Sequence, residues 1–62
     1  MQITWHWLYD NNKDVPYPNG KPFNNPNLIY PGQELTMPDG STYVVQPGDY
    51  LIKIAKWWNE EN

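Results

Sequence analysis

A Pro-Asp-Gly turn at residues 38–40 separates two short segments, 33–38 and 41–46, in which apolar and polar residues alternate. Alternation with a period of two is typical of strands with one buried face. The apolar positions that share a face are Leu35 and Met37 in the first segment and Tyr43 and Val45 in the second. Asp-Gly is a strong signal for a two-residue hairpin turn, so we expect two antiparallel strands joined at Asp39-Gly40. A two-stranded sheet is not stable alone, and helices must therefore cover its apolar face.

The length and composition bound what can surround this hairpin. A chain of 62 residues has room for one small domain, and chains of this size are only marginally stable. No cysteine is present, which excludes disulfides and cysteine-based metal or redox sites, and a single histidine, His6, excludes a His-rich metal site. The four Trp, five Tyr and one Phe must supply much of the apolar area, and we expect some of these rings to serve a binding surface instead.

Charge and hydropathy exclude other classes. The net charge is −3 and the four lysines are scattered, so the sequence gives little support for nucleic-acid binding. No apolar run approaches the roughly 20 residues that a membrane span needs. The first residues lack the features of a signal peptide, which predicts a soluble chain synthesised in the cytoplasm without an export address.

Two helices are expected, one at each end of the chain. Residues 3–12 carry apolar side chains at helical spacing, with Thr4 as a possible N-cap and Asn11 and Asn12 tolerating a left-handed C-terminal end. The positions expected on its inner face are Trp5, Leu8 and Tyr9. Residues 13–27 hold four prolines and predict a loop, and 28–33 should pack onto the core.

The last helix is expected after Pro47-Gly48, with Asp49 as its N-cap. Its inner face should carry Leu51, Ile54, Ala55 and Trp58. The fold class is therefore a small α+β domain in the order helix, strand, strand, helix.

Three segments resemble the LysM domain. Residues 43–55 resemble the first half of that domain, residues 25–38 resemble its second half, and residues 5–14 are similar to the second helix of the long variety found in phage tail proteins. The matching positions in the first half are Tyr43, Val45, Gly48, Asp49, Leu51, Ile54 and Ala55. Those in the second half are Asn25, Pro26, Ile29, Pro31, Gly32, Gln33, Leu35 and Pro38, and those in the helix are Trp5, Leu8, Tyr9, Asn12 and Asp14.

The order of these segments departs from the family, whose domains run strand, helix, helix, strand. Residues 1–62 can be a single circularly permuted LysM-like domain. Alternatively, 1–38 can be the end of one repeat and 41–62 the start of the next, or two chains can exchange halves. The hairpin turn favours the permutant, because a linker between independent repeats needs no hairpin chemistry.

The resemblance implies a non-catalytic module that binds glycans containing N-acetylglucosamine, of the peptidoglycan or chitin type. The implied glycan-binding residues are Gly48, Asp49, Tyr50 and Leu51 in one loop and Asn27, Leu28, Ile29 and Tyr30 in the other. Tyr50 stands where the family usually has threonine, and its ring can either stack on a sugar or fill the groove. A purely structural turn remains the alternative for this loop.

The second hypothesis is that the chain is a structural joint in a phage tail, baseplate or related injection assembly, with neighbouring proteins as partners and no sugar binding. We expect Trp5 and Trp58 to pack inside, and His6, Trp7 and Trp57 to face outward. An enzyme is not expected, because Asp10 and Asp14 lack matching pocket residues for glycoside cleavage. The sequence predicts no cofactor, no metal and no membrane contact, and either a monomer or a half-exchanged dimer.

Overall fold

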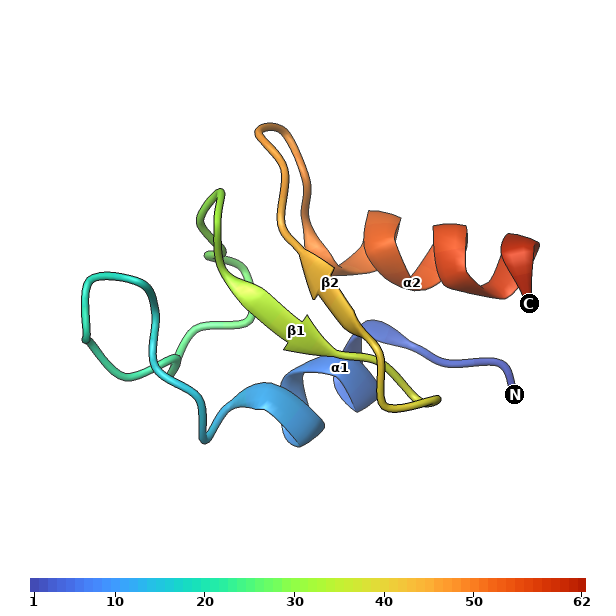
Figure 1. Cartoon of the computed structure of the whole chain (residues 1–62), viewed down its shortest axis with the longest axis horizontal. Helices are drawn as coiled ribbons and strands as arrows, with labels where there is room; N and C mark the ends of the chain where they lie inside the picture. Colours follow the sequence, from blue (N-terminus) through green and yellow to red (C-terminus); the bar gives the residue numbers. More distant parts are fainter.

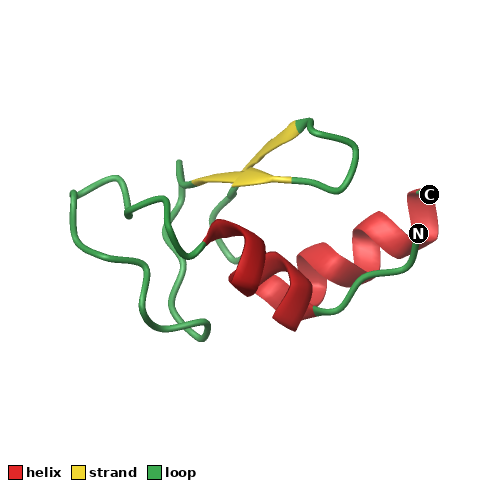
Figure 2. Ribbon diagram, turned by 90° about the horizontal axis from the view of Figure 1, so that it is seen from below, coloured by secondary structure: helices red, strands yellow, loops and turns green.

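The computed structural model describes residues 1–62 as two helices and one antiparallel sheet of two strands. The elements are α1 (Trp5–Asn12), β1 (Glu34–Thr36), β2 (Thr42–Val44) and α2 (Leu51–Glu61) (Figure 1). The hairpin forms one layer, and the two helices form a second layer on one side of it (Figure 2). The predicted α+β class and the order α-β-β-α are therefore confirmed.

The strands pair within the chain, with Leu35 opposite Tyr43. The predicted turn is slightly longer than two residues. The Gly40 N–H donates to the Met37 carbonyl at 2.9 Å, and Gly40 has a left-handed φ of 85°. Asp39 has no positive φ, so this is a three-residue loop that begins at Pro38 and ends in a left-handed glycine.

Asp39 stabilises this loop from outside the strands. One of its carboxylate oxygens accepts from the Ser41 hydroxyl at 2.6 Å and from the Ser41 N–H at 2.9 Å. These two hydrogen bonds hold the pKa of the Asp39 carboxyl below its usual range.

Helix α1 begins as expected, but it ends for a different reason. The Thr4 hydroxyl accepts from the Trp7 N–H at 3.5 Å, which confirms the N-cap. At the other end, Lys13 is the C-cap in right-handed conformation, and no asparagine is left-handed. Asn12 is instead buried, with 1% of its surface exposed. The prediction that Asn11 and Asn12 end the helix through a left-handed conformation is therefore wrong.

The Asn12 side chain joins α1 to the outer edge of β1. Its amide nitrogen donates to the carbonyls of Leu8, at 2.8 Å, and Thr36, at 3.2 Å. Its amide oxygen accepts from the Thr36 N–H at 2.7 Å. The side chain thus pairs with Thr36 as a neighbouring strand would, and it satisfies an edge that the two-stranded sheet leaves open.

Helix α2 begins one residue later than predicted. Its N-cap is Tyr50, whose side chain makes no capping hydrogen bond, so the expected capping role of Asp49 is wrong. The Asp49 carboxylate is already bonded to Tyr43 and Gln46 in the preceding turn. The predicted inner face is confirmed, because its four positions are all buried: Leu51, Ile54, Ala55 and Trp58.

One apolar core draws on every part of the chain. Its buried members are Ile3, Leu8, Tyr17, Phe23, Leu35, Met37, Val45, Leu51, Ile54, Ala55 and Trp58. Two of them, Tyr17 and Phe23, come from the predicted loop 13–27, which contains no helix or strand, as expected. In the following segment Gln33 is buried and Ile29 packs against the core. Neither helix is long and apolar enough to cross a membrane.

Candidate functional site

Two cavities lie on either side of a boundary formed by Trp5 and Ile52, which line both. We call the first the loop cavity. It has a volume of about 380 Å³, and its walls are Trp5, Pro26, Asn27, Tyr50, Leu51 and Ile52. The second, of about the same volume, lies between α2 and the N-terminal residues, and we call it the terminal cavity.

The structure brings some of the predicted site residues together in the loop cavity. Asn27 approaches from one loop, and Tyr50 and Leu51 approach from the other. The remaining predicted residues do not line it: Gly48, Asp49, Leu28, Ile29 and Tyr30. Tyr50 is 58% exposed, so its ring has not collapsed onto the core.

Tyr17 holds the 25–28 side of the loop cavity in place. Its hydroxyl donates to the Leu28 carbonyl at 2.7 Å, with the Asn25 carbonyl a second acceptor at 3.2 Å. The Tyr17 ring packs against Phe23 and, edge-on at 5.0 Å between ring centroids, against Tyr30. Burial raises the pKa of the Tyr17 hydroxyl above its ordinary value.

Asp49 fixes the loop that leads into Tyr50. One of its carboxylate oxygens accepts from the Tyr43 hydroxyl at 2.6 Å and from the Gln46 N–H at 2.9 Å. The hydrogen bond to Asp49 raises the pKa of Tyr43 to about 12, because ionising the phenol would break it beside a carboxylate. The turn also requires Gly48, which has a left-handed φ of 87°.

Three walls of the loop cavity were missed by sequence reasoning: Trp5, Pro26 and Ile52. Pro26 and Ile52 adjoin predicted residues, so the neighbouring positions were a usable signal. Trp5 was expected inside, but it is half-buried, packs against the core edge and stacks on the exposed His6 at 3.6 Å between ring centroids. Only the crossing of α1 and α2 places this ring between the two cavities.

The other tryptophans divide between core and surface. Trp58 is buried and Trp57 is exposed, as predicted. Trp7 was expected to face outward, but it is half-buried and packs against the core. That expectation is wrong because helix α1 buries more of its circumference than its apolar spacing suggests.

The loop cavity has the chemistry of a site for an uncharged polar ligand. Its six lining residues include two aromatic rings, two aliphatic side chains and one amide, and none is charged. Rings offer apolar faces against which a sugar can stack, and an amide both donates and accepts hydrogen bonds. No group of three or more His, Cys, Asp or Glu side chains is placed to hold a metal ion.

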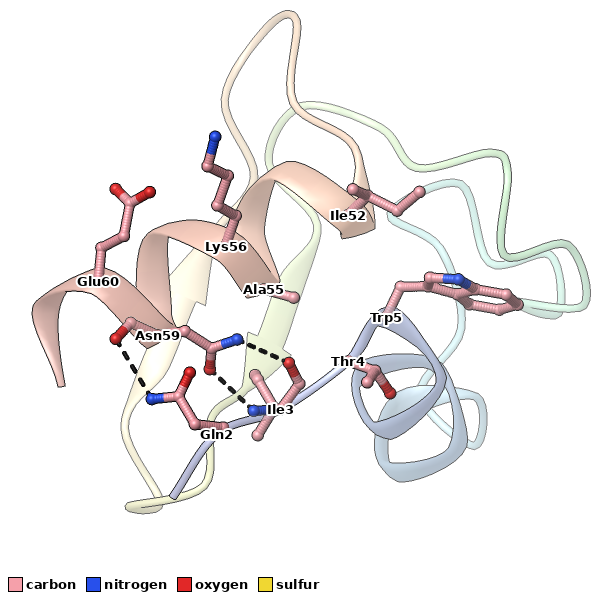
Figure 3. Close-up of a pocket in the computed structure, with 9 residues that line it drawn as sticks. All are labelled: Gln2, Ile3, Thr4, Trp5, Ile52, Ala55, Lys56, Asn59 and Glu60. Atoms are coloured by element: carbon pink, nitrogen blue, oxygen red, sulfur yellow. Dashed lines mark hydrogen bonds between the residues drawn. The ribbon is translucent and has the colours of Figure 1, made fainter.

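The terminal cavity depends on Asn59 of α2. The Asn59 amide oxygen accepts from the Ile3 N–H at 2.8 Å, and its amide nitrogen donates to the Ile3 carbonyl at 2.8 Å. Gln2 adds a longer hydrogen bond, at 3.4 Å, to the Asn59 carbonyl. Figure 3 shows these bonds fastening residues 2–3 along α2, so the N-terminal segment forms one wall.

Residues 43–57 match the sequence model of the LysM domain. This LysM segment contains most of β2, the Asp49 turn and residues 51–57 of α2, so it supplies Tyr50, Leu51 and Ile52 to the loop cavity. LysM domains are binding modules, generally not catalytic, and the match suggests a carbohydrate-binding module.

A second similarity is to the envelope glycoprotein gp62 of Human T-cell leukemia virus 1 (isolate Caribbea HS-35 subtype A). The identity is 41% over 44 residues, which is 71% of this chain but 9% of that protein. The chain therefore spans only a small part of this relative. No solved structure matches the chain.

Proposed function

We propose that the chain is a non-catalytic module that binds glycans containing N-acetylglucosamine, of the peptidoglycan or chitin type, in the loop cavity. The observation that carries this proposal is that the LysM segment and Asn27 of the distant 25–28 loop wall one uncharged cavity. The exposed Tyr50 ring and the Trp5 ring also line it.

The ligand's chemistry fits these walls. A pyranose ring has an apolar face that stacks on an aromatic side chain, which Trp5 or Tyr50 supplies. An acetamido group carries one donor and one acceptor, and the Asn27 amide offers the complementary pair. The acetamido methyl needs an apolar contact, which Leu51 and Ile52 provide. A neutral glycan needs no charged partner, and this cavity has none.

We also propose that residues 1–62 form one LysM-like domain with its halves in permuted order. Two features support this. The hairpin turn connects the strands directly, and Asn59 bonds the Ile3 backbone where an unpermuted chain would need a covalent connection between the helices. Figure 2 shows the N- and C-termini next to each other. A monomer of about 7.4 kDa in solution is expected, and a dimer would favour exchanged halves.

Titration with chito-oligosaccharides and pull-down on peptidoglycan and chitin test the binding function. Tyr50→Ala should weaken binding by about two- to ten-fold, since an aromatic contact contributes roughly 0.5–1.5 kcal/mol. The matched control is Val44→Ala, which shortens an exposed side chain outside both cavities and should bind like the original chain. If neither polymer nor oligosaccharide binds saturably, the proposal is wrong.

The second candidate function is a structural joint in a phage tail, baseplate or related injection assembly. One observation favours it: Ile52 is 62% exposed, and other large apolar side chains are exposed with it. These others include Val44, Tyr50 and Trp57. In that role the partners are neighbouring assembly proteins, and the chain reaches a virion or cell wall through the assembly. Failure to bind either glycan polymer would favour this candidate.

A further inference from the structure

The two outer edges of the hairpin differ. The outer edge of β1 is closed, because the Asn12 side chain bonds to both the N–H and the carbonyl of Thr36. Helix α1 also packs close to β1, whereas no Cα atom of either helix lies within 8 Å of a Cα atom of β2. The sheet ends at β2, so the outer edge of this strand has no neighbouring strand.

The strand pairing shows which backbone groups of β2 face outward. The Val45 N–H donates to the Gln33 carbonyl at 2.9 Å, so this residue faces β1. Because alternate residues of an antiparallel strand bond to the same neighbour, the peptide groups of Thr42 and Val44 point away from β1. Their N–H groups and the Thr42 carbonyl make no hydrogen bond within the chain. The Val44 carbonyl accepts from the Gln46 side-chain amide at 3.1 Å and retains a second lone pair.

The usual protections of a sheet edge are missing here. Proteins often prevent pairing at an edge with lysine, proline or a bulge, and residues 41–46 contain no charge and no proline. The strands also pair without a bulge, and both Thr42 and Val44 are exposed. Pro38 and Pro47 stand beyond the two ends of this segment. We call the outward side of residues 41–46 the β2 edge, and it has room to pair with one short extended segment.

An exposed aromatic ring lies beside the β2 edge on the helix side of the sheet. Tyr43 stands opposite the buried Leu35, and its ring packs against Trp57 of α2 at 5.4 Å between ring centroids. Trp57 is 43% exposed, so Tyr43 covers only part of it. On the other face of the sheet, Val44 is 46% exposed. A strand added at the β2 edge would therefore contact Trp57 with one of its faces and Val44 with the other.

The charges near the ends of the β2 edge are acidic. Asp39 is exposed in the turn before it, and Glu61 is exposed one helical turn beyond Trp57. Lys53, one turn before Trp57, already pairs with Asp49 at 4.0 Å. The whole chain carries a net charge of −3. A segment with basic ends therefore fits this surface better than one with acidic ends.

We propose that the β2 edge binds an extended segment of another protein as an added antiparallel strand. The segment alternates apolar side chains, which contact Trp57, with polar ones, and it carries basic side chains at its ends. Backbone hydrogen bonds supply the affinity in this kind of recognition, and side-chain contacts supply the selectivity. The surface lies outside both cavities, so the proposal is independent of glycan binding.

A second folded copy of this chain fits the β2 edge less well. It brings another net charge of −3, and like charges repel. It also brings its own α2, which extends beyond β2 on the side away from β1 (Figure 1). An extended segment without a folded domain attached at this point avoids both obstacles.

NMR titration with a blocked peptide tests the proposal. The peptide has lysine at both ends and alternating valine and threonine between them. Saturable shifts are expected for the amide signals of Thr42 and Val44 and for the indole N–H signal of Trp57. Both amides should also exchange with solvent more slowly in the complex, because they become donors to the added strand.

Two N-methylated forms of the peptide are matched controls for the backbone contact. Directly opposed residues of an antiparallel pair share a face, so the threonines bond to Thr42 and Val44 when the valines contact Trp57. Methylation of the threonine N–H groups should abolish binding. Methylation of the valine N–H groups, which point to solvent, should leave it intact. The reverse pattern would overturn the antiparallel arrangement.

Variants of the chain assign the binding to its residues. Val44→Pro removes one outward N–H and should weaken binding by about ten-fold, whereas Val44→Thr keeps this N–H and should bind like the original chain. If Val44→Pro does not fold, as judged by its amide spectrum, the methylated peptides decide the question. Trp57→Ala should weaken binding by about two- to ten-fold through the lost aromatic contact.

The charge of the partner is tested by replacing both lysines of the peptide with glutamate. This form should bind about two- to five-fold more weakly at low salt, and the difference should shrink at about 0.5 M salt. Equal binding of the two forms at low salt would overturn the basic character assigned to the partner.

Three results would overturn strand addition itself. The first is no saturable shift at Thr42 and Val44, and the second is equal binding of the two N-methylated peptides. The third is a shift of these two amide signals when the protein alone is concentrated, which would assign the β2 edge to a second copy. Absence of glycan binding would overturn the proposed function and leave this proposal standing.

Discussion

The hairpin (33–46) and the long loop (13–32) contribute to the same core by opposite means. The hairpin has strands of only three residues each, ordered by backbone hydrogen bonds and a glycine turn. The loop has no helix or strand, yet it inserts Tyr17 and Phe23 among the core side chains. In a chain this short, regular elements alone bury too little apolar surface, and the loop's rings complete the core.

The sharpest way to break this comparison is to remove one core side chain from each region. Phe23→Ala should lower the free energy of unfolding by about 3–5 kcal/mol, and Leu35→Ala by about 2–5 kcal/mol, because both leave cavities in a packed core. Urea denaturation followed by tryptophan fluorescence measures both. Losses this large approach the whole stability expected of such a chain, so Phe23→Leu is a milder second variant. A loss below about 1 kcal/mol for Phe23→Ala would show that the loop only covers the core.

The junction between the two regions can be tested at Asn12. Asn12→Ala should cost about 2–3 kcal/mol, because it leaves the Thr36 N–H and carbonyl without their buried partner. The adjacent, exposed Asn11 is the matched control, and its change to Ala should cost less than about 0.5 kcal/mol. Urea denaturation of both variants separates a specific hydrogen-bond role from a general effect on α1. Equal losses would mean that Asn12 does not connect α1 to the hairpin.

A tyrosine hydroxyl stabilises each region: Tyr43 in the hairpin and Tyr17 in the loop. Their hydrogen bonds should contribute different amounts to the free energy of unfolding. Tyr43→Phe removes a hydrogen bond to the Asp49 carboxylate and should cost about 1–2 kcal/mol at neutral pH. Because the pKa of Tyr43 is raised to about 12, its contribution is fully present below the unfolded value of about 10. It should be lost as pH rises from about 10 to about 12. The melting temperatures of the original chain and of Tyr43→Phe should therefore converge as pH rises across this range.

Tyr17→Phe is the comparison variant for the loop. It removes a hydrogen bond to a neutral carbonyl and should cost only about 0.5–1.5 kcal/mol. It should also weaken chitotetraose binding, because the Tyr17 hydroxyl holds the segment that carries Asn27. If Tyr43→Phe costs no more than Tyr17→Phe, the carboxylate acceptor adds nothing to the hairpin side.

Much of the fold could be predicted because its signals are local. Thr4 precedes an apolar helical face, Asp39-Gly40 stands between alternating segments, and Leu51, Ile54, Ala55 and Trp58 recur at helical spacing. The two errors at the helix ends arose because a polar side chain bonds to a residue outside its helix. Asn12 bonds to Thr36 instead of ending a helix, and Asp49 bonds to Tyr43 instead of capping one.

The candidate site was only partly predictable for the same reason. Tyr50, Leu51 and Asn27 were expected because their segments resemble the two loops of the LysM domain. Trp5 joins them because α1 lies beside α2, which no spacing in the sequence encodes.

The sequence by itself determined the hairpin, the two helical faces and their order along the chain, since turn chemistry and side-chain periodicity act over a few residues. Only the tertiary structure decided which loop rings enter the core, which amides bridge distant backbone and how Trp5 comes to separate two cavities. These depend on contacts between residues far apart in the chain, such as Ile3 with Asn59, whose partners are known only once the whole chain has folded.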